Sequence, residues 1–165
     1  MIFLIFTSIM QKKIIKNGDN VVVLTDKGLY PDYVKALGNK HVAIAPMHDI
    51  WMRDFTSAHP AQPVMFRYTA AGQGGAKKGQ TISDEVQDEF KYYSQKAGLQ
   101  FTQSKLLNDG GNWVENGYGN LVLSTKFLAD NKLTESEARK KLMALTGAKQ
   151  IAFIEADEQG GLEHA

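Results

Sequence analysis

The sequence predicts an α/β fold, because helical and strand-forming segments alternate along its 165 residues. Four segments share one order, in which a helical stretch ends at a glycine and a short apolar strand follows: IIKNGDNVVVL, KALGNKHVAIA, QKAGLQFTQ and ALTGAKQIAFI. Glycine at a helix end can take the left-handed conformation that other residues avoid. The length is that of one ordinary domain, so we expect a single domain over residues 1–165.

The first expected helix is IFTSIMQKKIIKNG, which ends at Asn17-Gly18 and has an apolar face that we expect to be buried. A cleaved signal peptide is the alternative, but here the positive residues follow the apolar run instead of preceding it. The run is also too short to span a bilayer. These features favour a cytoplasmic protein without a membrane partner.

The next helices are recognised by the residues that begin them. Pro31 suits the first turn of PDYVKAL, and Ser83, followed by two acidic residues, is expected to cap SDEVQDEFKYYSQKA. Thr134 and Glu137 form a capping-box pattern at the start of TESEARKKLMALTG. The glycine-rich residues 70–80, which precede Ser83, are expected to form a mobile loop.

Further strand candidates lie between these helices: PVMFRYT, NWVEN and NLVLSTK. The last two are joined by NGYGN, so WVENGYGNLVL is expected to form a β-hairpin. Asp54, Asp109 and His164 each follow one of the helix–glycine–strand units, at equal spacing along the sequence. Loops at equivalent ends of repeated units recur on one face, so we expect these three side chains to converge on one site.

Composition and charge exclude several classes of function. The 19 basic and 18 acidic side chains give a formal charge of +1, which does not indicate a nucleic-acid partner. The sequence contains no cysteine, which excludes a disulfide scaffold, a cysteine-based zinc site and a cysteine nucleophile within these residues. His48 and His59 fit no metal-binding spacing, so we expect neither a metal nor a cofactor.

The stretch DIWMRDFTSAHP places Trp51 between the carboxylates of Asp49 and Asp54. Such a set can clamp a planar cation, because a carboxylate accepts two parallel N–H bonds from a guanidinium and an indole face stacks on it. The alternative is structural: Arg53 pairs with an Asp, and Trp51 fills the core.

Asp109 and His164 are the other candidates. Asp109 precedes Gly110-Gly111, a tight backbone turn where a ligand could approach closely, or else it forms an Asx-type turn that leads into the hairpin. His164 follows another Gly-Gly pair and is either a general acid or base or a solvated histidine near the end of the sequence.

Three stretches, DIWMRDFTSAHP, NDGGNWVENGYGNLVLSTKFLADN and GGLEHA, resemble signature blocks of the agmatine deiminase and Porphyromonas-type peptidylarginine deiminase family. The resemblance runs from about Val21 to Ala165. It implies a pentein fold, an α/β propeller of five repeated units, of which this chain would form about half, as the N-terminal portion of a deiminase.

The resemblance also implies roles for individual residues. Trp51 would line the guanidinium pocket, and Asp54 would bind two guanidinium nitrogens. Asp109 and Asn112 would contact the substrate, although the position of Asp109 usually carries Glu in agmatine deiminases. His164 would be the general acid or base of a His-x-Asp pair. The Asp of that pair and the nucleophilic Cys of the family are not among these residues.

In the reaction that the resemblance implies, a cysteine thiolate attacks the guanidinium carbon, and His donates a proton so that ammonia leaves. Water then cleaves the intermediate to a ureido product: N-carbamoylputrescine from agmatine, or citrulline from peptidyl-arginine. Without a cysteine, the chain is expected to be inactive alone. An arginine substrate needs a basic partner for its carboxylate, and the region after Asp54 offers only Arg67 and then lysines, which favours agmatine.

Three interpretations remain open. The chain is a portion of a deiminase whose coding frame continues with an Asp after Ala165, or a cysteine-free remnant that binds guanidino compounds without turnover. Such a partial propeller is expected to self-associate through its open strand edges. The third interpretation is an unrelated α/β domain that binds no guanidinium.

Overall fold

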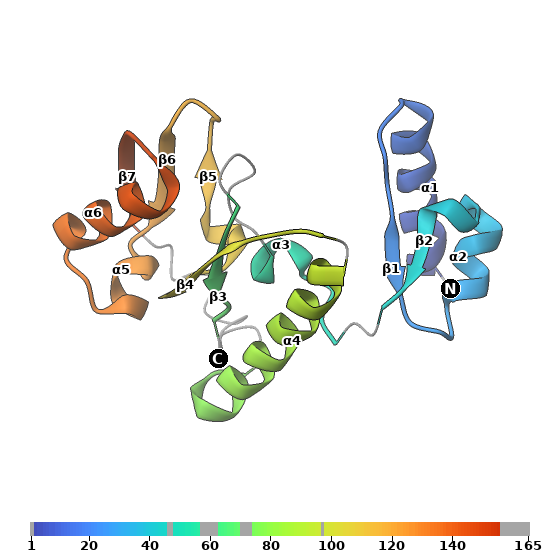
Figure 1. Cartoon of the computed structure of the whole chain (residues 1–165), viewed down its shortest axis with the longest axis horizontal. Helices are drawn as coiled ribbons and strands as arrows, with labels where there is room; N and C mark the ends of the chain where they lie inside the picture. Colours follow the sequence, from blue (N-terminus) through green and yellow to red (C-terminus); the bar gives the residue numbers. More distant parts are fainter. Residues whose placement is uncertain (1, 46–47, 57–62, 70–73, 97, 156–165) are drawn as a thin grey trace. The chain divides into compact units, whose positions relative to one another are not determined.

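The computed structural model describes residues 2–45, 48–56, 63–69, 74–96 and 98–155. These residues confirm the predicted α/β class (Figure 1). They belong to two compact units, residues 1–48 and residues 49–165. The expectation of a single domain stays a prediction, and each unit is described by itself.

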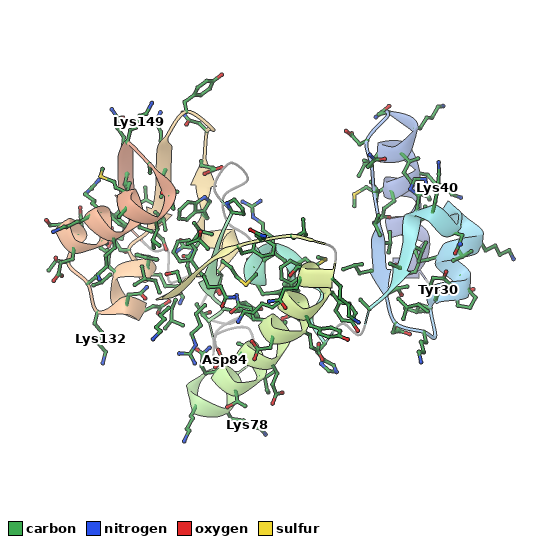
Figure 2. The ribbon with its side chains drawn as sticks, in the orientation of Figure 1. Tyr30, Lys40, Lys78, Asp84, Lys132 and Lys149 are labelled. Atoms are coloured by element: carbon green, nitrogen blue, oxygen red, sulfur yellow. The ribbon has the colours of Figure 1, made fainter. Side chains whose placement is uncertain are left out.

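The first unit contains two helices and a pair of parallel strands, in which Val23 lies opposite Val42. The Tyr30 hydroxyl donates to Asn39 Oδ1 at 2.6 Å and ties the start of the second helix to the turn that follows it (Figure 2). The elements in chain order are α1 (Ile2–Lys16), β1 (Val23–Thr25), α2 (Tyr30–Leu37), the 3-10 turn η1 (Asn39–His41) and β2 (Val42–Ile44).

Helix α1 confirms the predicted first helix and stops before Asn17-Gly18, where Gly18 has a φ of 95°. Its expected burial is wrong for two residues, because Ile9 and Met10 remain 51% and 48% exposed. Within the described ranges, every helix is too short or too polar to cross a membrane.

The second unit holds two sheets. In one, β3 and β4 run parallel; in the other, β6 pairs with β5 in an antiparallel hairpin and with β7 in parallel. The predicted hairpin is therefore confirmed. The elements are α3 (Met52–Phe55), β3 (Val64–Arg67), α4 (Ala76–Lys96), β4 (Thr102–Leu107), the 3-10 turn η3 (Gly110–Asn112), β5 (Val114–Glu115), β6 (Asn120–Ser124), α5 (Lys126–Asn131), α6 (Glu135–Thr146) and β7 (Gln150–Ile154).

A helix–strand unit recurs in both parts of the chain. The pairs β1–β2, β3–β4 and β6–β7 are all parallel, and each pair is connected through at least one helix (Figure 1). The glycines that end the connecting helices, Gly38, Gly98 and Gly147, have φ values of 89°, 75° and 70°. The helix–glycine–strand order read from the sequence is therefore present in the backbone.

The core of the second unit lies between β3, the β5–β6–β7 sheet and helices α5 and α6. The ring of Phe66 on β3 packs on Trp113 and Phe127, with centroids 5.4 and 6.2 Å apart. Leu142 of α6 is fully buried in this cluster. The core thus fixes β3 against the sheet, and the end of β3 carries the contacts described below.

The start of α4 differs from the sequence prediction. The helix begins at Ala76, so Ser83 is not its cap, and residues 76–80 are helical instead of loop. Residues 70–73 of the expected loop lie outside the described residues. The Ser83 side chain is fully buried, and its hydroxyl donates to Thr69 O at 2.7 Å. A tertiary contact with the strand end therefore uses the hydroxyl that the pattern assigned to a cap.

Candidate functional site

The segment around Trp51 forms a tight turn that leads into one turn of helix. The buried Asp49 carboxylate accepts the Trp51 N–H at 2.8 Å, and Trp51 O accepts the Asp54 N–H at 2.8 Å. Trp51 thus stands at the N-terminus of α3, with Asp54 one turn later. Trp51 is 62% exposed, so it does not fill the core.

The Gly-Gly loop after β4 approaches α3 very closely. Asp54 Oδ1 accepts the Gly111 N–H at 2.7 Å. A Cβ atom on Gly110 would lie 1.7 Å from Arg53 O, and one on Gly111 would lie 3.0 Å from Asp54 Oδ1. Only glycine fits at Gly110, because real Cβ atoms do not come so near a carbonyl oxygen. The two predicted clusters, far apart in sequence, therefore meet in space.

Asp109 directs its carboxylate toward the end of β3. Thr69 donates its N–H to Asp109 Oδ1 at 3.1 Å and its hydroxyl to Oδ2 at 2.8 Å. The alternative Asx-type turn is not formed, because the loop is closed instead by the backbone, from Asn112 N to Asp109 O at 2.9 Å. Each carboxylate oxygen has two lone pairs, so Asp109 retains capacity to accept further donors.

The electrostatics of this place are dominated by carboxylates. Burial raises the pKa of Asp109, against the opposing effects of the Thr69 donors and the charge of Lys126, and the charge of Asp54 raises it further. Burial also raises the pKa of the Tyr68 phenol, together with its bond to Asp49 and the charges of Asp109 and Asp54. Asp49, Asp54 and Asp109 thus all act on one hydroxyl.

Asn112 is engaged within the protein. Its Oδ1 accepts the Ser124 N–H at 2.9 Å, and its Nδ2 donates to Asn108 Oδ1 at 3.1 Å. These bonds tie the Gly-Gly loop to β6 and fix the orientation of both amides, because Ser124 N–H needs an oxygen partner. The expected contact of Asn112 with a substrate stays a prediction.

Two residues of the site, Tyr68 and Thr69, were not among the sequence candidates. The Tyr68 hydroxyl donates to Asp49 Oδ2 at 3.0 Å, while Thr69 holds Asp109. The available signal was their place at the end of the expected strand PVMFRYT. The carboxyl end of a strand in α/β proteins is where ligand-binding side chains gather.

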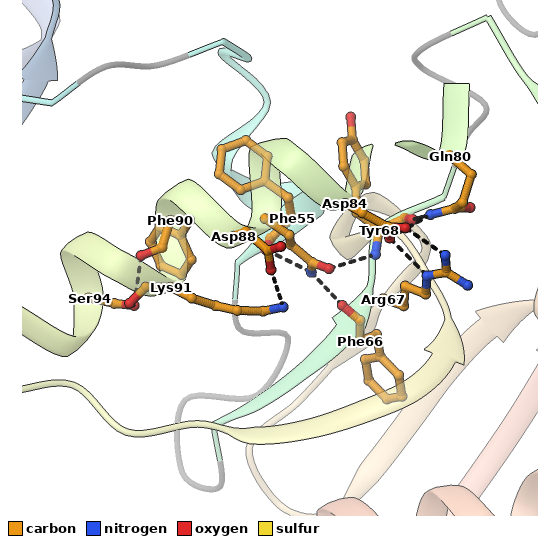
Figure 3. Close-up of polar contacts among 11 residues, drawn as sticks. Phe55, Phe66, Arg67, Tyr68, Gln80, Asp84, Asp88, Phe90, Lys91 and Ser94 are labelled. Carbon is orange, nitrogen blue, oxygen red and sulfur yellow. Dashed lines mark hydrogen bonds and ion pairs between the residues drawn. The ribbon is translucent and has the colours of Figure 1, made fainter. Parts of the chain in front are cut away.

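Arg67 faces α4 and forms an ion pair with Asp84. It donates to both Asp84 oxygens, from Nε at 2.8 Å and from Nη2 at 2.6 Å, and Gln80 adds a third donor to that carboxylate at 3.0 Å (Figure 3). The hydrogen bonds of this pair raise the pKa of Arg67 and lower that of Asp84.

The remaining predicted residues are His164 and His59, which lie outside the described residues. The structure brings Asp54 to the Gly-Gly loop that follows Asp109, while the convergence of the three side chains on one site stays a prediction. Across the ranges that the structure describes, no three acidic or imidazole side chains are grouped as metal ligands would be.

Comparison with known proteins gives one family. The family model for Porphyromonas-type peptidyl-arginine deiminases matches residues 6–162. Comparison with curated proteins gives no match.

Several solved structures share the fold. The agmatine deiminase of C. jejuni has a TM-score of 0.66 at 20% sequence identity, over 92% of this chain and 46% of that one. The agmatine deiminase of Enterococcus faecalis has a TM-score of 0.64 at 14% identity, over 88% and 43%. A Cys-to-Ser form of the C. jejuni enzyme with substrate bound has a TM-score of 0.57 at 20% identity, over 83% and 42%. The chain thus spans less than half the length of these relatives.

Proposed function

Because the chain belongs to the Porphyromonas-type peptidyl-arginine deiminase family, we propose that its acidic site binds the guanidino group of a small molecule. The observation that carries the proposal is the meeting of Asp54 and Asp109 through the Gly-Gly loop, beside the exposed indole of Trp51. These are the parts that a planar, delocalised cation requires.

The chemistry of each part supports this assignment. Asp54 and Asp109 each accept bonds from neutral donors of the protein, and each oxygen retains a lone pair for a guanidinium N–H. Trp51 offers a flat π face, on which a guanidinium stacks with an attraction of roughly 0.5–2 kcal/mol. The carboxylates also localise positive charge on the central carbon and so prepare it for nucleophilic attack.

In the complete family reaction, a thiolate adds to that carbon and ammonia leaves, with His164 as the proposed proton donor. Water then cleaves the C–S bond, so that a ureido product forms and the thiol is regenerated. The 165 residues contain no cysteine, so the function proposed for them is binding without covalent turnover. We expect the chain alone to release no ammonia from a guanidino compound.

We propose an amine-ended substrate such as agmatine in preference to arginine. Arg67 is the only arginine between Asp54 and Asp109, and its guanidinium is paired with Asp84. It is therefore not available to hold a substrate carboxylate. The three carboxylates of the site would repel a carboxylate in addition.

Isothermal titration of the 165-residue chain tests this function. We expect agmatine to bind more tightly than arginine, and putrescine, which lacks the guanidino group, to bind weakest. Asp54→Asn should weaken agmatine binding by roughly 30-fold or more, because a charged acceptor is lost. Equal affinity for agmatine and putrescine, or no effect of Asp54→Asn, would contradict the proposal.

Self-association through open strand edges and a cytoplasmic location stay predictions. Light scattering on the purified chain tests the first directly, because a monomer at all concentrations would contradict it.

A further inference from the structure

Tyr68 reaches the Trp51 turn from the end of β3. Its hydroxyl donates to Asp49 Oδ2 at 3.0 Å, and the other oxygen of that carboxylate accepts the Trp51 N–H at 2.8 Å. Both Tyr68 and Asp49 are buried, at 3% and 7% exposure. In such surroundings a hydrogen bond to a carboxylate is stronger than at the surface.

The Trp51 turn depends on these bonds, because packing holds little of its side chain. The indole is 62% exposed, while its backbone is fixed on both sides, by Asp49 and by the Asp54 N–H. A continuous series of hydrogen bonds therefore runs from Tyr68 through Asp49 and Trp51 to Asp54, and from Asp54 to Gly111.

The strand end that carries Tyr68 is itself held rigidly by α4. The buried Gln87 side chain accepts the Tyr68 N–H at 3.1 Å and donates to Phe55 O at 3.1 Å and Phe66 O at 2.6 Å. Figure 3 shows these three partners together between α4 and β3. One amide thus joins the backbone of Tyr68 to the end of α3, so the hydroxyl is presented at a fixed position.

We propose that Tyr68 is a positioning residue of the guanidinium site. Through Asp49, it orients Trp51 as the flat wall beside the Asp54 carboxylate. The inference rests on the proposed function of that site and deepens it. The next residue, Thr69, holds Asp109 in a comparable way, so adjacent residues at one strand end support both arms of the site.

The test begins with Tyr68→Phe, which removes the hydroxyl and keeps the ring that packs on Phe55 with centroids 5.8 Å apart. Tyr118→Phe is the matched control, because Tyr118 is 82% exposed at the hairpin. The indole N–H resonance of Trp51, in the chain without ligand, reports the turn directly. Trp113, which is buried, provides the internal reference.

We expect Tyr68→Phe to shift or broaden the Trp51 resonance and to weaken agmatine binding by roughly tenfold, the size of one lost hydrogen bond to a charged group. Asp49→Ala should have an effect of similar size. Because Tyr68 acts through Asp49, the double variant should bind no more weakly than Asp49→Ala alone. Tyr118→Phe should change neither measurement.

The outcomes separate the two proposals. If the unsubstituted chain binds no guanidino compound, the proposed function fails. The Trp51 resonance then still tests whether Tyr68 positions Trp51 through Asp49. If agmatine binds and Tyr68→Phe changes neither its affinity nor the Trp51 resonance, the positioning role is overturned. Additive losses in the double variant would also overturn it. Should Tyr68→Phe fail to fold, Asp49→Ala with the same two measurements decides.

Discussion

Two places in the second unit bring carboxylates together with polar partners, and they do so in opposite ways. On the face between α4 and β3, Asp84 is paired with Arg67, and Asp88 is paired with Lys91. At the site between α3 and the Gly-Gly loop, the bonds that Asp54 and Asp109 accept come from neutral donors, Gly111 and Thr69.

The difference appears in the protonation equilibria. The pKa of Asp84 is lowered, chiefly by its hydrogen bond to Arg67, whereas burial raises that of Asp109. The groove of about 420 Å³ beside Arg67 is lined by this ion pair and by Asp88 and Lys91, which form a second pair. At the α3 site, the hydrogen bonds that described residues donate to Asp54 and Asp109 come from uncharged groups, while the charge of Lys126 lowers the pKa of Asp109. An internal ion pair indicates a structural role, while partly buried carboxylates that accept bonds from uncharged donors favour a ligand site.

The largest expected effect comes from a steric clash between the Gly-Gly loop and α3. Gly110→Ala would place a Cβ atom 1.7 Å from Arg53 O, so the loop must move away from α3. The Gly111–Asp54 bond should break with that movement, and we expect a loss of about 2–4 kcal/mol in the free energy of unfolding together with loss of agmatine binding. Urea unfolding followed by circular dichroism measures the first, and calorimetry measures the second.

A suitable control for this variant is Gly117→Ala. Gly117 has a φ of 72°, and apart from its chain neighbours no atom lies within 4 Å of the position that a Cβ would take, so alanine there meets backbone strain alone. A cost of about 1 kcal/mol with intact binding is expected. Equal costs at the two positions would show that the close approach at Gly110 does not determine the site.

A smaller effect, of opposite sign for stability and binding, is expected for Asp109→Asn. The folded-state pKa of Asp109 is raised, so its contribution favours folding at low pH and is lost as the pH rises through that pKa. Removing the charge should therefore raise the free energy of unfolding at pH 7 and with it the Tm. Agmatine binding should fall at the same time, because the site loses a charge.

The pH series supplies the check. The stability difference between Asp109→Asn and the unsubstituted chain should vanish on acidification, when Asp109 is protonated in both states. Asp88→Asn should stay within about 0.5 kcal/mol at every pH, because the Asp88 side chain is 73% exposed. A difference for Asp109→Asn that does not depend on pH would contradict the electrostatic explanation.

Features set by neighbouring residues were predictable from the sequence. The glycines after the helices have positive φ, and Thr134 with Glu137 forms the capping box, in which Thr134 Oγ1 accepts the Glu137 N–H at 3.3 Å. Asp54 and Asp109 were found because each follows a repeated unit. Such features depend on residues that are close in the sequence, so a local pattern is enough to predict them.

Features set by partners far along the chain were not predictable in this way. Ser83 resembles a helix cap, yet its hydroxyl contacts Thr69. Tyr68 and Thr69 bond to carboxylates 19 and 40 residues away, respectively, and no local pattern encodes those partners. The short helix α5 was missed because a single turn or two carries little periodicity; it ends at Lys132, which has a φ of 52° (Figure 2).

The smallest expected effect concerns the ion pair between Arg67 and Asp84. The side chains of Arg67 and Asp84 are 44% and 39% exposed, so solvent screens their attraction. Arg67→Leu should cost only about 0–1 kcal/mol in the free energy of unfolding. Because the guanidinium of Arg67 is already committed to Asp84, arginine and agmatine should bind the variant as they bind the unsubstituted chain. A selective loss of arginine affinity would mean that Arg67 leaves Asp84 to hold a substrate carboxylate, and the preference for an amine-ended substrate would then be wrong.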